Sequence, residues 1–396
     1  IRSMRFGKPL LKPLLAMLLI GQLTLSPALL WAQQQRAPVT NVAGSRVPPP
    51  VNTLPQIRRI VRGVTGLEKP AANRLVVRQN EPRAVLDWNS FDIGANASTH
   101  FDQQGNSSWK ALNRIYDQDP SRIYGRLSAD GSIYLINQNG LLFGPGARVN
   151  VHSLVASSLA MAEEDFVGNI LRFAGDETAG RVVNQGELTA KTGGSIFLLA
   201  PEVQNGGIMI APSGQVGLVA ATEVEIGFPE DENRLFPFVY VKQTGESGTA
   251  VNLPGAQLSA EGGLAGLYGR VVNQEGIIKS VTTISNNGRI ELHASETATT
   301  GGDSVTASPI SEDPERVHQS FRVEGGEIHV AGLDTTDGET NTETSVKRIE
   351  HGGRIEAPSG TVELKARERV YLERGSSIDV GGEWIQRDAA STLVEA

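Results

Sequence analysis

Residues 130–144 read Asp-Gly-Ser-Ile-Tyr-Leu-Ile-Asn-Gln-Asn-Gly-Leu-Leu-Phe-Gly, the clearest signal of the fold in this chain. Two short apolar segments are separated and flanked by Asp, Asn and Gly. This pattern is typical of strands joined by tight turns, because Asn and Gly tolerate backbone conformations that other residues avoid. The stretch therefore predicts two strands with a turn at Asn137–Gly140.

The same pattern continues on both sides of this stretch. It recurs as Asp-Trp-Asn-Ser-Phe-Asp-Ile-Gly (87–94), Leu-Asn-Arg-Ile (112–115), Ile-Tyr-Gly-Arg-Leu (123–127) and Val-Asn-Val-His-Ser-Leu-Val-Ala-Ser-Ser-Leu (149–159). Together these blocks resemble the N-terminal secretion domain of filamentous haemagglutinin-like exoproteins, the passengers of two-partner secretion in Gram-negative bacteria. The resemblance implies a secreted or cell-surface protein. It also implies a partner, an outer-membrane barrel transporter with periplasmic receptor domains.

The resemblance also implies roles for individual residues. In the family, an Asn-Arg-Ile type motif and an Asn-Pro-Asn-Gly type motif are linked to secretion. Carried onto this chain, the motifs mark five residues for transporter recognition: Asn113, Arg114, Asn137, Asn139 and Gly140. This chain has Gln138 where the family usually has Pro, and Gln does not preset the backbone of a turn. The alternative is that these residues only shape turns.

A repeat of about 20 residues begins near residue 180. Asn184–Ala190 is echoed 21 residues later, Gly194–Ala200 is echoed 20 residues later, and Gly180–Gln185 recurs unchanged as Gly269–Gln274. Such a period with short β-type segments favours a solenoid, in which stacked coils share one core. The sequence therefore predicts an all-β fold, a right-handed parallel β-helix. An antiparallel sandwich is the competing architecture.

The chain divides into segments by composition. Residues 1–32 are expected to be a signal peptide, because basic residues precede an apolar run and Ala32 suits cleavage. Residues 33–56 are expected to be an extended leader, 57–165 the secretion domain and 166–396 β-helix repeats. Two polar stretches, near 296–320 and 333–347, are expected to be loops on the solenoid wall.

Charge and cysteine content limit the partners and the covalent cross-links that the chain can have. The 396 residues include 44 acidic and 36 basic side chains and no Cys, so no disulfide can form. Residues 33–83 hold nine basic and two acidic side chains, and the rest of the mature chain is acidic. An acidic body argues against nucleic acid as a partner, because nucleic acid binding requires basic surfaces.

The search for catalytic motifs returns none. The six His residues show no metal-ligand spacing, and no phosphate-binding or nucleophile motif occurs. We therefore expect no enzyme, no cofactor and no metal site. The expected activity is adhesion to a ligand on a host or neighbouring cell. A polysaccharide-active β-helix enzyme and the stalk of a toxin-delivery protein remain alternatives.

Overall fold

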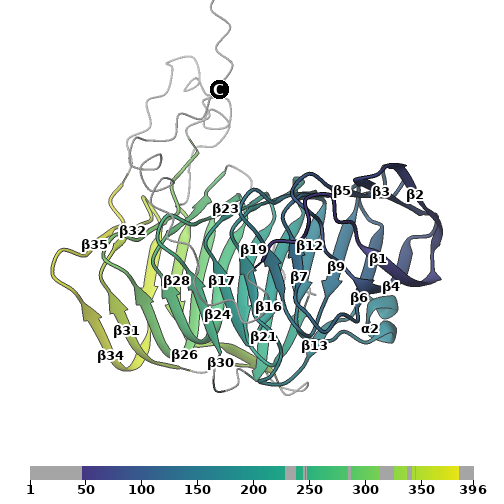
Figure 1. Cartoon of the computed structure of the whole chain (residues 1–396). Helices are drawn as coiled ribbons and strands as arrows, with labels where there is room; N and C mark the ends of the chain where they lie inside the picture. The colour runs from purple at the N-terminus through teal and green to yellow at the C-terminus, as the bar shows by residue number, and fades with distance from the viewer. Residues whose placement is uncertain are drawn as a thin grey trace, which may run out of the picture. The chain divides into compact units, whose positions relative to one another are not determined.

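The computed structural model describes residues 47–227, 238–243, 246, 248–283, 287–311, 325–336, 341–343 and 345–382. These residues form a parallel β-helix whose coils stack from the purple β2 and β3 to the yellow β34 (Figure 1). Each complete coil contributes one strand to each of three walls. The predicted all-β parallel β-helix is thus confirmed, and the antiparallel sandwich is excluded. The expected signal peptide lies outside the described residues.

Each strand pairs in parallel with the strand at the same place in the next coil. The first wall contains β4 (Arg83–Ser90), β6 (Lys110–Ile115), β9 (Ser132–Ile136), β12 (Ser153–Ser157), β16 (Ser195–Ala200), β19 (Gln215–Ala220), β24 (Leu264–Gln274), β26 (Arg289–Thr300), β28 (Glu327–Ala331) and β33 (Thr361–Leu364).

The second wall contains β7 (Ser121–Ile123), β10 (Leu141–Phe143), β14 (Val182–Asn184), β17 (Glu202–Asn205), β22 (Thr249–Asn252), the later parts of β24 and β26, β31 (Val346–His351) and β34 (Ala366–Leu372). The third wall contains β3 (Arg74–Gln79), β5 (Ser98–Asp102), β8 (Arg126–Ala129), β11 (Arg148–Val151), β15 (Glu187–Ala190), β18 (Ile208–Pro212), β23 (Gln257–Glu261), β25 (Ile277–Val281), β27 (Val305–Ala307), β32 (Arg354–Glu356) and β35 (Ser377–Asp379).

Two antiparallel strands close the N-terminal end of the solenoid. Strand β1 (Gln56–Arg62) pairs with β4, and β2 (Val64–Ala71) pairs with β3. A cap of this kind stops further parallel strands from adding to the first coil. Ile60 of β1 is 38% exposed.

The described part of the expected leader packs on the solenoid. The amide of Thr53 donates to the carbonyl of Pro50 in a turn, and Leu54 is buried. The amide of Asn96 donates to the carbonyl of Val51. Residues 47–55 therefore belong to the folded domain.

The core between the walls is apolar and holds a ladder of stacked amides. Asn184, Asn205, Asn252 and Gln274 occupy equivalent places on four successive coils, and all are fully buried. Each amide nitrogen from Asn184 to Asn252 donates to the side-chain oxygen of the next residue at 2.8–2.9 Å. These bonds satisfy the buried amides at the corner between the second and third walls.

A second apolar cluster covers the outer face of the first wall. Helix α2 (Glu163–Gly168) and the antiparallel strands β13 (Leu171–Ala174), β20 (Glu223–Gly227) and β21 (Phe238–Gln243) lie over this face. We call these four elements the lid. The chain leaves the solenoid for the lid at the same corner each time, after a first-wall strand and before a second-wall strand. The lid buries the outward side chains Leu112, Tyr134, Val155, Phe197 and Val219.

Several expected boundaries need correction. The expected domain boundary at 165 falls inside α2, and the coils continue across it, because β12 pairs with both β9 and β16. The stretch 296–320 is not a loop in its first part, since residues 296–300 lie in β26 and 305–307 in β27. Residues 312–320 lie outside the described part.

The stretch 333–347 leaves the solenoid at the corner from which the lid segments leave. It contains a short antiparallel pair, β29 (Asp334–Thr336) and β30 (Asn341–Glu343). Leu333 is buried in the outer apolar cluster. The expected loop is therefore a hairpin whose first residue is anchored on the first wall.

Candidate transporter-recognition site

The turn between β9 and β10 is built around the buried side chain of Asn137. Its amide nitrogen donates to the carbonyl of Asp119 at 3.1 Å and to the hydroxyl of Ser121 at 3.0 Å. Its side-chain oxygen accepts from the amide of Asn139 at 2.9 Å. Asn137 therefore fixes its own turn and ties it to the preceding coil.

Gly140 occupies a position that only glycine fits. Its φ is +102°, and a Cβ there would lie 2.5 Å from the carbonyl oxygen of Arg181 on the next coil. The amide of Gly180 donates to the carbonyl of Gln138 at 2.7 Å. The turn is thus pressed directly against the backbone of the following coil.

Gln138 and Asn139 are the exposed residues of this turn. The side chain of Asn139 donates to the carbonyl of Asp117 at 2.7 Å. The folded domain therefore presents only Asn139 of the three predicted residues in this motif. Gln138 presents a flexible polar side chain where the family usually has a rigid Pro.

Asn113 lies inside the solenoid, between the core positions Leu86 and Leu135 of the neighbouring strands. The indole nitrogen of Trp88 donates to its side-chain oxygen at 2.9 Å. Its amide nitrogen reaches the carbonyls of Ala111 and Tyr134, both at 3.2 Å. Trp88 and Phe91 are both fully buried and anchor the core.

Arg114 bridges the first wall to the lid. Its guanidinium contacts Asp87 at 2.8 Å and Glu163 of helix α2 at 2.9 Å. Arg59 of the cap contacts the other oxygen of Asp87 at 2.7 Å, so the nearly buried Asp87 is paired twice. Burial alone would lower the pKa of Arg114, but the hydrogen bond and charge of Asp87 raise that pKa above its ordinary value.

The five predicted residues therefore do not form one surface. Asn137, Asn139 and Gly140 share a turn, whereas Asn113 lies in the core and Arg114 on the outer face of the first wall. The lid and its contact with Arg114 were missed from the sequence. The available signal was the set of apolar side chains Phe166, Leu171 and Phe173.

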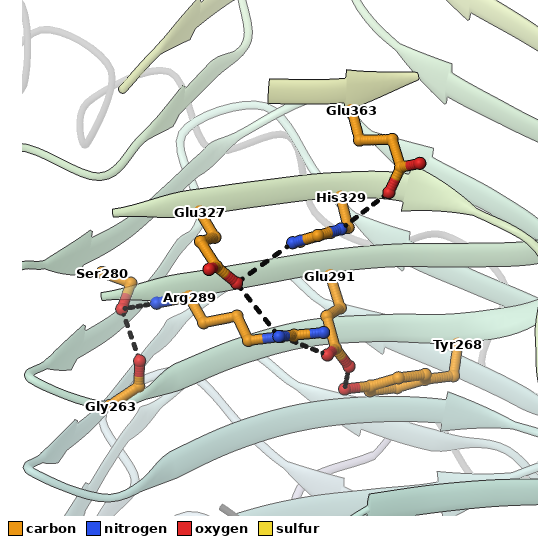
Figure 2. A network of polar contacts seen from close by, with 8 residues as sticks. All are labelled: Gly263, Tyr268, Ser280, Arg289, Glu291, Glu327, His329 and Glu363. Atoms are coloured by element: carbon orange, nitrogen blue, oxygen red, sulfur yellow. Dashed lines mark hydrogen bonds and ion pairs between the residues drawn. The ribbon is translucent and has the colours of Figure 1, made fainter. Parts of the chain in front are cut away.

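Carboxylates do gather on the first wall, where Figure 2 shows Glu291, Glu327 and Glu363. Their strands, β26, β28 and β33, lie at the end remote from the cap. Burial would raise the pKa of Glu291, but the charges of His293 and Arg289 and the hydroxyl of Tyr268 hold it below its usual range. The hydrogen bond to His329 lowers the pKa of Glu327. Both groups therefore stay ionised near neutral pH, whereas a general acid requires a raised pKa.

Two further searches cover only the described residues. Within the ranges given above, no cluster of three or more His, Asp or Glu side chains is arranged to hold a metal ion. In the same part of the chain, no helix has both the length and the apolar character needed to cross a membrane.

Comparison with known proteins identifies relatives of the coils. Two matches are heme/hemopexin-binding proteins of Haemophilus influenzae, 38% identical over 104 residues and 35% identical over 137 residues. These matches cover 26% and 34% of this chain but only 11% and 15% of the relatives. The crystal structure of the HMW1 secretion domain from Haemophilus influenzae superposes with a TM-score of 0.60 at 20% identity, covering 83% of this chain and 99% of that domain.

The family model for the TPS secretion domain, where TPS denotes two-partner secretion, matches residues 62–306. This match extends well past residue 165, in agreement with coils that continue across that position. It spans more than half of the chain, and the structural likeness to the HMW1 domain shows the same fold. The chain therefore belongs to the TPS secretion domain family, whose members are exported passenger domains of exoproteins with an outer-membrane transporter as partner.

Proposed function

We propose that the chain directs an exoprotein to its transporter and that the transporter reads the recognition residues before the chain folds. The observation that carries this proposal is the burial of Asn113, Asn137 and Gly140 in the folded solenoid. A receptor that contacts these residues needs the unfolded chain. A solenoid several strands wide is also too bulky for a narrow barrel, so folding follows export.

Export in the unfolded state suits other features of the chain. The absence of Cys means that no disulfide can obstruct threading. The family match supports passage through an outer-membrane barrel, whose periplasmic receptor domains would bind the chain first. Residues 1–32 would act as the signal peptide for the first membrane and be removed, so that the mature chain begins near Gln33.

Adhesion is the proposed activity of the exported protein. A solenoid offers an extended surface for a ligand on a host or neighbouring cell. Heme or hemopexin binding, which the names of the two relatives report, is not proposed for these coils, because the shared region covers at most 15% of those proteins. The shared region instead fits the export function that all such passengers need.

The test compares binding of the folded and the unfolded chain to the periplasmic receptor domains of the partner transporter. A urea-unfolded chain, diluted into the receptor domains, should bind, and the refolded chain should not. In the unfolded state, Asn113→Ala and Asn137→Ala should each weaken binding. Asn184→Ala serves as the control, because it is a buried Asn outside the two motifs.

The outcomes separate the possible recognition modes. Equal binding of folded and unfolded protein would contradict recognition before folding. Binding of folded protein that depends on Asn139 alone would place recognition on the exposed turn. Unchanged binding of all variants would leave the five residues as turn and core residues.

A further inference from the structure

We propose that His329 is a protonation-dependent clasp that fastens β33, the last first-wall strand among the described residues, to the solenoid. This clasp lies on the outer face of the first wall (Figure 2). Strands β28 and β33 lie beyond the family match, which ends at residue 306.

The imidazole of His329 is held between two carboxylates. Its Nδ1 lies 3.1 Å from Glu363 on β33, and its Nε2 lies 3.2 Å from Glu327 on its own strand, β28. His329 and Glu363 are directly paired in the parallel register of the two strands. One ring nitrogen therefore faces the next coil, and the other faces its own.

Geometry of this kind favours the doubly protonated ring. A neutral imidazole has one N–H, so a lone pair on the other nitrogen would face a carboxylate oxygen. The imidazolium donates to both carboxylates and removes that repulsion. In agreement, the hydrogen bond to Glu327 raises the pKa of His329, against the opposing effects of burial and of Arg289.

The neighbouring charges extend the clasp across the preceding coils. On β26, Arg289 contacts Glu291 at 2.7 Å and Glu327 at 3.1 Å. Glu291 is the direct register partner of His329 and also accepts from the hydroxyl of Tyr268 on β24 at 2.6 Å. Protonated His329 thus adds a cation to Arg289 among the three carboxylates Glu291, Glu327 and Glu363. His293 on β26 also acts on Glu291 through its charge.

The pH dependence follows from the direction of the shift. The stabilisation by His329 is fully present below the ordinary His pKa of about 6.5 and is lost as pH rises through the raised pKa of the folded protein. Glu327 remains ionised across this window, because its pKa is lowered. Mild acidity should therefore tighten β33, and neutral to alkaline pH should loosen it.

The experiment follows local opening of β33 in the whole exported chain by amide hydrogen exchange between pH 5.5 and 8.5, corrected for the intrinsic rate. In wild type, opening of residues 361–364 should increase several-fold across this range. His329→Gln and Glu363→Gln should remove most of this pH dependence. His152→Gln is the matched control and should behave as wild type, because burial and Lys191 lower the pKa of His152, which has no carboxylate clasp.

A ring titration of His329 by NMR in wild type provides a second readout that does not depend on any variant. A His329 pKa above the ordinary value of about 6.5 is expected. A pKa at or below that value, or the same pH dependence of β33 opening in wild type and His329→Gln, would overturn the proposal.

Discussion

At the scale of single residues, the glycine of the recognition turn combines two constraints. Gly140 has a positive φ and also meets the backbone of Arg181, whereas Gly146, at φ +84°, has open space where a Cβ would lie. Side chains at positive φ carry a strain cost of about 1 kcal/mol or more. Substitutions at the two glycines therefore distinguish the cost of backbone strain, which is present at both, from the cost of a steric clash, which is present only at Gly140.

We predict that Gly146→Ala lowers the free energy of unfolding by about 1 kcal/mol. Gly140→Ala should lower it by about 1–2 kcal/mol more, because the carbonyl of Arg181 cannot move without shifting the next coil. Urea denaturation of both variants measures the difference. Equal losses would show that the coils can separate enough to admit a Cβ.

Two of the three predicted recognition asparagines, Asn113 and Asn139, should differ in their effects on stability. Asn113→Ala leaves the indole N–H of Trp88 without its acceptor in the core, at a cost of about 1–3 kcal/mol. Asn139→Ala removes one hydrogen bond at an exposed turn, so it should lower the free energy of unfolding by only about 0.5 kcal/mol. Thermal unfolding at one protein concentration compares them, and a larger loss for Asn139→Ala would contradict these roles.

At the scale of elements, the amide ladder ties successive coils together inside the core. Asn205 accepts from Asn184, donates to Asn252 and closes its own turn through the amide of Gly207. Removing it leaves buried partners unsatisfied on two other coils. The ladder therefore couples the coils more strongly than one hydrogen bond per coil would.

We predict that Asn205→Ala lowers the free energy of unfolding by about 2–4 kcal/mol. Gln204→Ala, one residue earlier on the same strand, is the control, because its side chain points outward and is not part of the ladder. It should cost less than about 0.5 kcal/mol. Similar losses of unfolding free energy in both variants would mean that the amide ladder adds little to stability.

At the scale of the whole molecule, the lid makes coils from distant parts of the chain depend on one another. Strands β4 to β12 have an outer apolar face that packs mainly against residues between 159 and 241. The first coils are therefore incomplete until β20 and β21 have folded. Folding strictly coil by coil, which a simple solenoid would allow, would leave this face exposed to water.

The lid leads to a prediction about Phe166, which is buried and packs edge-on to Tyr134 with ring centroids 5.4 Å apart. Phe166→Ala should cost about 3–5 kcal/mol and increase binding of an apolar dye such as ANS. Val167 is exposed on the same helix, so Val167→Ala should change neither the stability nor the binding of ANS. If Phe166→Ala were as stable as wild type, the lid would be dispensable.

The architecture of this protein could be predicted from its sequence. Spacing of about 20 residues and turn residues at fixed places predicted stacked coils, and the predicted echoes pair in the structure. Ser195 to Ala200 lie beside Gln215 to Ala220, and Asn184 lies beside Asn205. These features are local and periodic, because every coil must meet the same steric demands as its neighbour.

Only the tertiary structure decided which face each residue occupies. The hexapeptide at 180–185 recurs at 269–274, yet the second copy is shifted by one residue, so Gln274 rather than Asn273 takes the ladder position of Asn184. In a strand, a slip of one residue exchanges the inner and outer faces. The lid was hidden for a related reason. Its contacts join residues far apart in sequence, and the outward apolar positions show no period that distinguishes them from core positions. The burial of Asn113 and Asn137 depends equally on neighbouring coils, so a motif shared with the family could not show whether those residues are exposed.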